Sequence, residues 1–277
     1  MAEKIKVELD GVPGTLLWNL YHRAAEARRP DALLEDPRAV ELVESIDFPF
    51  ERFGEPKMAQ GHALRVLTFD RAIGRFLQAH PGGMVVALGE GLETQFWRVD
   101  DGRVRWLTVD LPETVEVRRR LLPDDPPRRR TLPGSALDLR WTDEVDTDGG
   151  VLITTQGLLM YLQPEEVRSL IAACAERFPG GTLLFDAIPH HLAERSRRDD
   201  LPGEGAYQAP PWHWSLDPGE HRQILGYHPN IADVRDLRYP RGRGALAIAP
   251  LAGFIPLIRK LRMPIVQVRF ADAVSAA

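Results

Sequence analysis

The sequence predicts an α/β fold with a mostly parallel sheet, and three features of the chain indicate it. The apolar run at residues 84–88 ends in a Gly-x-Gly turn at 89–91, and a helical pattern follows. A second apolar run, 104–109, ends in the acidic residue Asp110. Strand-like and helix-like patterns continue to alternate beyond it, and such alternation implies a parallel sheet with right-handed crossovers.

Helical segments precede the first predicted strand. Residues 16–25 mix apolar and polar side chains at helical spacing. A second helix begins after Asp36, which can cap it, with Pro37 in the first turn. A third helix carries apolar residues at helical spacing over 64–77 and ends before a Pro-Gly-Gly sequence. We therefore expect residues 1–83 to form an N-terminal helical cap.

The predicted core, residues 84–188, contains strands separated by helices. Helices are expected over 113–122 and from Pro164 to Phe178, where Pro-Gly-Gly again stops the pattern. The expected strands are 84–88, 104–109, a short third strand to which residues 131–133 lead, the β-branched run 151–155, and 182–186.

The regular alternation ends after the fifth strand. Residues 189–230 are rich in Pro, Gly, His and Trp and show weak periodicity. Loops after strand ends are where α/β folds build binding sites, so we expect a lid or substrate subdomain here. Strand-like segments resume at 234–239 and 265–270, and residues 231–277 are expected to complete the core.

The Gly-x-Gly turn and Asp110 together indicate a nucleotide-like cofactor. Glycines let the backbone turn tightly beside a ligand, and an acid at the next strand end can accept hydrogen bonds from a ribose. Two glycines rather than the three of the dinucleotide fingerprint favour a single-nucleoside cofactor such as S-adenosylmethionine over NAD. The alternative is a plain turn after a strand, with no ligand.

Four segments in this order resemble the leucine carboxyl methyltransferase family: 61–70, 85–94, 134–139 and 156–162. The bacterial branch with the tetracenomycin-type polyketide O-methyltransferases is the more similar, and the resemblance covers most of the chain. It implies a Rossmann-like class I methyltransferase sheet with an N-terminal helical cap and a lid insertion after strand five. It also implies O-methyl transfer from S-adenosylmethionine, with S-adenosylhomocysteine as product.

The resemblance also implies cofactor contacts. Arg65 is expected to bind the carboxylate of the cofactor's amino-acid tail through two hydrogen bonds. Gly89 and Gly91 would let the backbone approach that tail. Asp110, followed by Leu111, would accept both ribose hydroxyls. The alternatives are a surface arginine on a helix and an acid that only caps a helix.

Asp138 and Leu139 would face the adenine by the same resemblance, although a loop acid there can equally be exposed. Gln156 stands where the family often has Glu; it keeps an acceptor that can hold the cofactor's ammonium. Glu90 and Glu93 also depart from the family, which more often has a small residue and Asp there. These departures keep open a relative that binds cofactor without catalysis.

The acceptor pocket is expected to have aromatic walls, which suit an aromatic or polyketide-like acceptor. A carboxylate acceptor needs orientation and exclusion of water but no base, whereas a phenol or alcohol usually needs one. Tyr161, which can close the methyl-transfer channel, and the lid histidines His190, His191 and His213 are the catalytic candidates, and none is singled out by spacing. We therefore expect a carboxylate acceptor, with a hydroxyl acceptor as the alternative. The expected substrate-binding residues are Trp18, Tyr21, Tyr161, Trp212 and Trp214.

Composition bounds the remaining classes. A chain of 277 residues with 44% apolar and 27% charged residues fits a soluble globular protein. The net charge of −5 argues against a large nucleic-acid footprint, and the arginine runs 118–120 and 128–130 are expected to be solvated surface. The sole cysteine, Cys174, excludes an internal disulfide and should be a buried thiol.

No His/Cys cluster has zinc spacing, so no metal is expected. The N-terminus lacks a signal-peptide core, and the apolar stretch 244–258 is too short and too broken by proline to span a membrane. We expect a cytoplasmic enzyme acting on a small molecule, with no nucleic-acid or membrane partner. Monomer and homodimer stay open, as does an NAD(P)-dependent reductase, which the missing third glycine disfavours.

Overall fold

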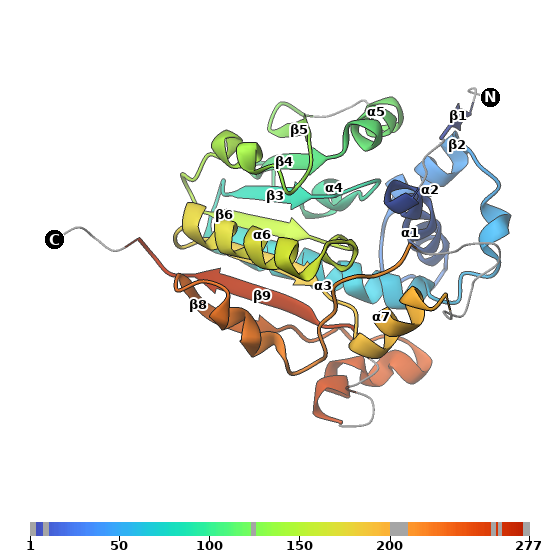
Figure 1. The fold of residues 1–277 in the computed structure, drawn as a ribbon. Coiled ribbons are helices and arrows are strands. Elements are labelled where there is room, and N and C mark those ends of the chain that lie inside the picture. The colour runs from blue at the N-terminus through green and yellow to red at the C-terminus, as the bar shows by residue number, and fades with distance from the viewer. Residues whose placement is uncertain are drawn as a thin grey trace.

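The computed structural model describes residues 4–7, 11–122, 126–199, 210–255, 259 and 262–273. Its centre is a seven-stranded sheet in the order β5-β4-β3-β6-β7-β9-β8, shown in Figure 1. All neighbouring pairs from β5 to β7 are parallel, while β9 runs antiparallel to both β7 and β8. The predicted mostly parallel α/β sheet is confirmed. Its strands are β3 (Met84–Leu88), β4 (Arg105–Asp110), β5 (Arg129–Pro133), β6 (Val151–Thr155), β7 (Thr182–Asp186), β8 (Ile231–Asp236) and β9 (Ile265–Phe270).

Both faces of the sheet are covered, which is why its central strands are continuous apolar runs. Side chains alternate between the faces along each strand. In β3, Val85 and Ala87 pack with Phe69 and Ile73 of α3 (Ala59–Ala79). Val86 of the same strand packs with the apolar side of α6 (Pro164–Arg177) on the opposite face. The two helices lie on opposite sides of the sheet in Figure 1.

The N-terminal segment is helical, as predicted. Helix α1 (Gly11–Ala27) and α2 (Pro37–Ser45) precede α3, and α1 packs against both. Asp36 caps α2, because its Oδ1 accepts a hydrogen bond from the backbone N–H of Ala39 at 3.1 Å. The short parallel pair β1 (Ile5–Lys6) and β2 (Ile46–Asp47) was not predicted.

The remaining elements are short. Predicted and observed helix ends differ by one residue in α5 and α6, within the usual uncertainty of helix ends. Part of the predicted lid, residues 200–209, lies outside the described residues. The remaining short elements are the helices α4 (Gln95–Val99), α5 (Pro112–Leu121) and α7 (His190–Arg197), and the 3₁₀ segments η1 (Phe50–Phe53), η2 (Leu139–Glu144), η3 (Leu159–Tyr161), η4 (His221–Gly226) and η5 (Gly244–Phe254).

The apolar stretch that begins at Gly244 forms the 3₁₀ segment η5. Within the residues that the structure describes, no helix is long and apolar enough to cross a membrane. Cys174 of α6 is fully buried, as predicted, and burial raises the pKa of its thiol to about 12.

The parallel strands bring polar residues together at one edge of the sheet. Gly89 follows β3, Asp110 ends β4, Gln156 follows β6 and Asp186 ends β7. Helix α1 lies beyond this edge in Figure 1. The strand order reverses between β3 and β6, and ligands of open α/β sheets bind at such a switch point. The fold thus places the candidate site over the centre of the sheet.

Candidate functional site

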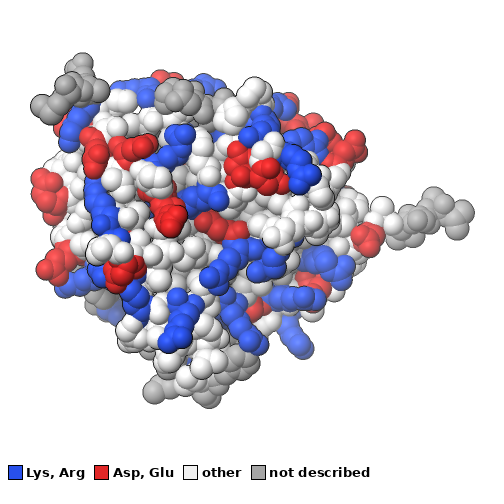
Figure 2. All heavy atoms as spheres, turned by 180° about the vertical axis from the view of Figure 1, so that it is seen from behind, with Lys and Arg blue, Asp and Glu red and all other residues white. Residues whose placement is uncertain are grey.

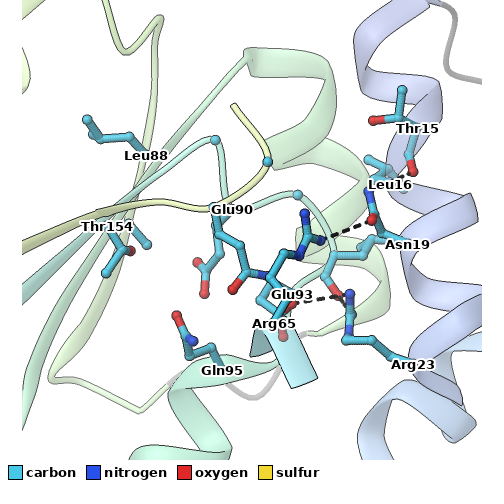
Figure 3. Close-up of a pocket in the computed structure, with 16 residues that line it drawn as sticks. Thr15, Leu16, Asn19, Arg23, Arg65, Leu88, Glu90, Glu93, Gln95 and Thr154 are labelled. Atoms are coloured by element: carbon cyan, nitrogen blue, oxygen red, sulfur yellow. Dashed lines mark hydrogen bonds and ion pairs between the residues drawn. The ribbon is translucent and has the colours of Figure 1, made fainter. Parts of the chain in front are cut away.

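A pocket lies at the carboxyl ends of β3 and β6, with α1 on its far side (Figure 3). Four of the predicted cofactor residues line it together: Arg65, Gly89, Gly91 and Gln156. The full lining consists of Thr15, Leu16, Asn19, Arg23, Arg65, Ala87, Leu88, Gly89, Glu90, Gly91, Leu92, Glu93, Gln95, Thr154, Gln156 and Gly157.

The turn after β3 requires its glycines. Gly89 and Gly91 have φ angles of +65° and +57°, in the left-handed region that side chains disfavour. A Cβ at Gly89 would also come within 3.1 Å of the Leu158 side chain. Asp110 fixes this turn, because its Oδ2 accepts a hydrogen bond from the Gly91 N–H at 2.7 Å. The backbone of residues 89–91 is therefore fixed in this conformation where it lines the pocket.

Asp110 is buried, and burial raises its pKa although two backbone N–H groups oppose the shift. Its second oxygen accepts from the N–H of Leu111 at 2.8 Å. Each carboxylate oxygen can accept more than one hydrogen bond, so acceptor capacity for a ligand remains. Leu111 itself is 36% exposed.

Arg65 projects from α3 into the pocket and is held from two sides. Its Nη1 donates to Asp186 Oδ2 at 2.9 Å, and its Nη2 donates to Asn19 Oδ1 at 3.1 Å. Asp186 is fully buried, and its other oxygen accepts from the Gly157 N–H at 2.6 Å. Sequence analysis missed Asp186; the available signal was an acid at the end of a core strand, the same signal that identified Asp110.

Gln156 shares a hydrogen bond with Glu93. Its Nε2 donates to Glu93 Oε2 at 3.1 Å, while its Oε1 is buried and lacks a hydrogen-bond partner among the residues described. Glu93 forms ion pairs with Arg23 at 3.2 Å and Arg98 at 2.8 Å. Burial raises the pKa of Glu93, but the two arginines outweigh burial and hold it at about 2.

The ion pairs of Glu93 belong to a buried network that sequence analysis missed. Arg98 of α4 also binds Asp36 and Asp70, each at 2.8 Å. Arg23 of α1 lies 3.4 Å from Asp36, and it donates to the backbone oxygen of Leu92 at 2.7 Å. The network thus joins α1, α2, α3 and α4 to the loop that follows β3. Figure 3 shows Arg23 reaching from α1 to Glu93.

Glu90 also lies in a basic environment. Its Oε2 is 3.2 Å from Arg129 Nη2 and 3.5 Å from Arg118 Nη2. Arg118 and Arg129 are only 2% and 4% exposed, so the prediction that both arginine runs are solvated surface was wrong for these two. A buried carboxylate needs counter-charges, and these arginines supply them. The negative charge that departs from the family pattern is therefore compensated.

The structure does not bring Asp138 into the pocket. Asp138 caps η2 and pairs with Arg140, whose hydrogen bonds lower its pKa. Leu139 packs against the core beside α6. The same segment still approaches the site, because the Gly134 N–H donates to the backbone oxygen of Asp110 at 2.8 Å.

The predicted aromatic residues lie in two groups, and none of the five is among the described residues that line the pocket. Tyr161 is half-buried next to Thr15 and Trp212, and burial raises the pKa of its hydroxyl. The indole N–H of Trp212 is buried, and no described atom accepts its hydrogen bond with good geometry. Trp18 packs edge-on against the rings of His22 and His62.

Tyr21 and Trp214 lie elsewhere. The Tyr21 hydroxyl donates to Gly54 O at 2.7 Å within the N-terminal aromatic cluster, and its ring packs against Phe50 and Phe53. Trp214 is 4% exposed and packs against Phe185 in the core. Both rings anchor the fold at these positions instead of lining the pocket.

The lid histidines do not line the pocket. His190 is held between Ser215 Oγ at 2.7 Å and Glu220 Oε2 at 2.8 Å, and His191 and His213 are exposed. Sequence analysis missed another pair: His22 of α1 and His62 of α3 stack in parallel with ring centroids 5.0 Å apart. Burial lowers both pKa values, that of His22 to about 4.

Comparison with known proteins adds to this geometry. The family model for leucine carboxyl methyltransferase matches residues 17–175. The chain belongs to the leucine carboxyl methyltransferase family. It is therefore an S-adenosylmethionine-dependent O-methyltransferase. Within this family the pocket over β3 and β6 is the candidate cofactor site.

Two curated relatives are similar over about two thirds of their length. The tetracenomycin polyketide synthesis O-methyltransferase TcmP of Streptomyces glaucescens is 33% identical over 194 residues, covering 68% of this chain and 69% of that protein. The S-adenosyl-L-methionine-dependent methyltransferase dpfgK of Gibberella zeae is 28% identical over 206 residues, covering 67% and 69%.

Solved structures show the same fold at low identity. A putative methyltransferase from Thermobifida fusca aligns with a TM-score of 0.56 at 18% identity, covering 91% of this chain and 94% of that one. A protein from Bordetella parapertussis described as a possible exported protein aligns with a TM-score of 0.53 at 16% identity, covering 94% and 96%. At these identities the likeness extends to the fold alone.

The residues present fit the cofactor. When bound, S-adenosylmethionine supplies a methyl group on a positively charged sulfur, so the protein's task is to position and desolvate the reactants. The pocket offers an open glycine turn, a buried cation at Arg65 and an unsatisfied acceptor at Gln156 Oε1. A cation and an acceptor in one pocket match the opposite charges of an amino-acid tail.

Proposed function

We propose that this enzyme methylates a carboxylate of a small aromatic or polyketide-like acceptor and so forms a methyl ester. The supporting observation is the chemistry around Tyr161. Its hydroxyl is a hydrogen-bond donor beside the indole N–H of Trp212, and the positive charge of Arg65 lowers the pKa of that hydroxyl. A donor in a positive field suits an anionic acceptor oxygen, which needs no base.

The same proposal orients the cofactor. Arg65 binds the carboxylate of its amino-acid tail, and Gln156 Oε1 accepts from the ammonium. Asp110 accepts from the ribose through capacity that its two backbone contacts leave free. Asp138 and Leu139 are assigned to the adenine by family resemblance alone. In this orientation the amino-acid tail lies at the ends of β3 and β6, and the ribose lies at the end of the neighbouring strand β4.

The aromatic acceptor class is supported by Trp212 and Tyr161, and by TcmP, a relative named for tetracenomycin polyketide synthesis. The partly buried cluster around Tyr161 contains Leu192, Trp212 and Met263. Such a wall suits a flat apolar ring that carries one polar group.

A histidine panel tests the acceptor chemistry. His190, His191, His213 and His62 are each replaced by Gln, and turnover is measured on an acceptor that the wild type methylates. Each change should cost less than about tenfold, whereas losing a general base costs roughly hundredfold or more. The product should be an ester that mild alkali hydrolyses.

One observation favours a hydroxyl acceptor as the second candidate. His62 lies one helical turn before Arg65, and its Nδ1 is buried with no acceptor or donor partner in the described ranges. A hundredfold loss in His62→Gln, together with a product that survives mild alkali, would establish hydroxyl transfer and overturn the carboxylate proposal.

A further inference from the structure

We propose that Glu93 fixes the side-chain amide of Gln156 so that its oxygen faces the cofactor's ammonium, which makes Glu93 a positioning residue for the cofactor. The inference rests on the proposed placement of the amino-acid tail between Arg65 and Gln156. It assigns a function to a carboxylate that the family resemblance left without one.

The first step concerns the charge state of Glu93. Two arginines from different helices contact it, Arg23 of α1 and Arg98 of α4. Its Oε1 also accepts from the N–H of Thr94 at 2.9 Å. A carboxylate held this way is ionised at neutral pH, so it can only accept hydrogen bonds.

The second step concerns the orientation of Gln156. An amide can present either its oxygen or its NH₂ to a neighbour, and the neighbour decides which. Because Glu93 Oε2 accepts only, Gln156 must direct Nε2 toward it, and the contact is 3.1 Å. The oxygen then points the other way, where it is buried without a described partner.

The third step concerns what satisfies that oxygen. A buried acceptor without a donor is unfavourable, and a bound ammonium would remove the penalty. Arg65 lines the same pocket and carries a positively charged donor group, whereas Gln156 Oε1 is an acceptor. One acceptor and one cation, each held by a buried carboxylate (Glu93 and Asp186), therefore form a recognition pair for a zwitterionic α-amino acid.

The structure suggests a selective variant. Glu93→Gln places a neutral amide beside Gln156, so the orientation of Gln156 is no longer enforced. A flipped amide would direct its NH₂ toward the ammonium and oppose tail binding. Adenosine and ribose contacts lie at other strand ends and should be unaffected.

The experiment compares two ligands by calorimetry. S-adenosylhomocysteine carries the amino-acid tail, and 5′-methylthioadenosine lacks it. In Glu93→Gln, affinity for S-adenosylhomocysteine should fall about tenfold or more, while affinity for 5′-methylthioadenosine changes less than about twofold. Asp70→Asn is the matched control, because Asp70 also binds Arg98 but does not contact Gln156. It should not separate the two ligands.

Two further variants distinguish loss of the proposed contact from misfolding of the protein. Glu93→Asp keeps the charge and should keep most of the preference for the tailed ligand. The double variant Glu93→Gln/Gln156→Glu returns a carboxylate to the pocket and should recover S-adenosylhomocysteine binding to within about threefold. Equal losses for both ligands in Glu93→Gln, or no recovery in the double variant, would overturn the proposal. No acceptor is present in these titrations, so their failure is distinct from failure of the carboxylate proposal.

Discussion

Glu90 shows how one side chain can depart from a family pattern without loss of the site. A charged residue in the middle of a glycine turn would be unfavourable if it were buried alone. Here Arg118 and Arg129 approach the same carboxylate, and the Thr108 hydroxyl donates to it. Glu90 and the two arginines are thus a single buried unit, although they are distant in sequence.

Arg65 gives the sharpest prediction for a single residue. Arg65→Ala should weaken the binding of S-adenosylhomocysteine strongly and leave adenosine binding nearly unchanged, because the tail carboxylate is the part of the ligand that loses a contact. Arg65→Lys should recover part of the affinity, since an ammonium cannot reproduce two parallel hydrogen bonds. Titration calorimetry with both ligands measures the difference.

The alanine variant also leaves Asp186 buried without its ion pair. Breaking a buried pair costs about 3–5 kcal/mol of stability, so the lysine variant is the control for folding. Equal losses for adenosine and S-adenosylhomocysteine in a folded Arg65→Lys protein would exclude the proposed contact.

At the scale of elements, α1 connects the N-terminal segment to the cofactor site. It contributes Thr15, Leu16, Asn19 and Arg23 to the pocket. Its last turn is fastened through Glu26, which pairs with Arg243 at 2.7 Å. The helix is therefore tied both to the loop after β3 and to the segment before η5.

The contact between α1 and α3 predicts a pH effect on stability. His22 is fully buried, and burial lowers its pKa from 6.5 to about 4. The unfolded chain therefore binds a proton first, and stability is lost as pH falls from 6.5 toward 4. The difference corresponds to about 3 kcal/mol. His62 lies against the same ring and shifts in the same direction.

Denaturant unfolding at a series of pH values measures this effect. His22→Gln should flatten the slope of unfolding free energy against pH between 6.5 and 4, by up to about 1.4 kcal/mol per pH unit. Between pH 8 and 9, where His22 is neutral in both states, the slopes of variant and wild type should agree. An unchanged slope below pH 6.5 would show that His22 does not govern acid stability.

Elements bounded by strong local signals could be predicted from sequence. The predicted ranges 84–88, 151–155, 182–186 and 265–270 match β3, β6, β7 and β9, since each is an apolar run with clear limits. Strand β8 begins three residues earlier than predicted, because half-exposed positions interrupt its apolar pattern.

The site was only partly predictable for a physical reason. Gly89, Gly91 and Asp110 lie at or just after strand ends, where a local pattern locates them, and Gln156, directly after β6, was located by the family resemblance. The contact between Arg65 and Asp186, which are 121 residues apart, leaves no local signal, although the acid at the end of β7 does. The buried network around Arg98 was missed for the same reason.

At the scale of the whole molecule, ion pairs on the surface differ from ion pairs in the interior. On the face shown in Figure 2, basic and acidic side chains are interspersed. Exposed arginines often pair with nearby acids, as Arg128 does with Asp100 at 2.8 Å and Arg130 with Glu144 at 2.5 Å. Such exposed pairs contribute little to stability. The buried pairs concentrate at the carboxyl edge of the sheet, where α1, α3 and four strand ends meet.

This arrangement predicts that cofactor binding stabilises the molecule as a whole. A ligand in the pocket contacts α1, α3, β3 and β6 together, so it binds only the folded state. At about 100 times its Kd, S-adenosylhomocysteine should add roughly 2.7 kcal/mol, which raises Tm by roughly 5–10 °C in a chain of this size. NAD is the matched control, since the third glycine of its fingerprint is missing and it should shift Tm by less than about 1 °C. Differential scanning fluorimetry with both ligands at equal concentration makes the comparison.

The Arg65→Lys variant should show a smaller shift of Tm with S-adenosylhomocysteine than the wild type, because its contact with the tail is weaker. A shift with NAD that equals the shift with S-adenosylhomocysteine would mean that the pocket recognises only the adenosine half of the ligand, and the tail contacts at Arg65 and Gln156 would then have to be abandoned.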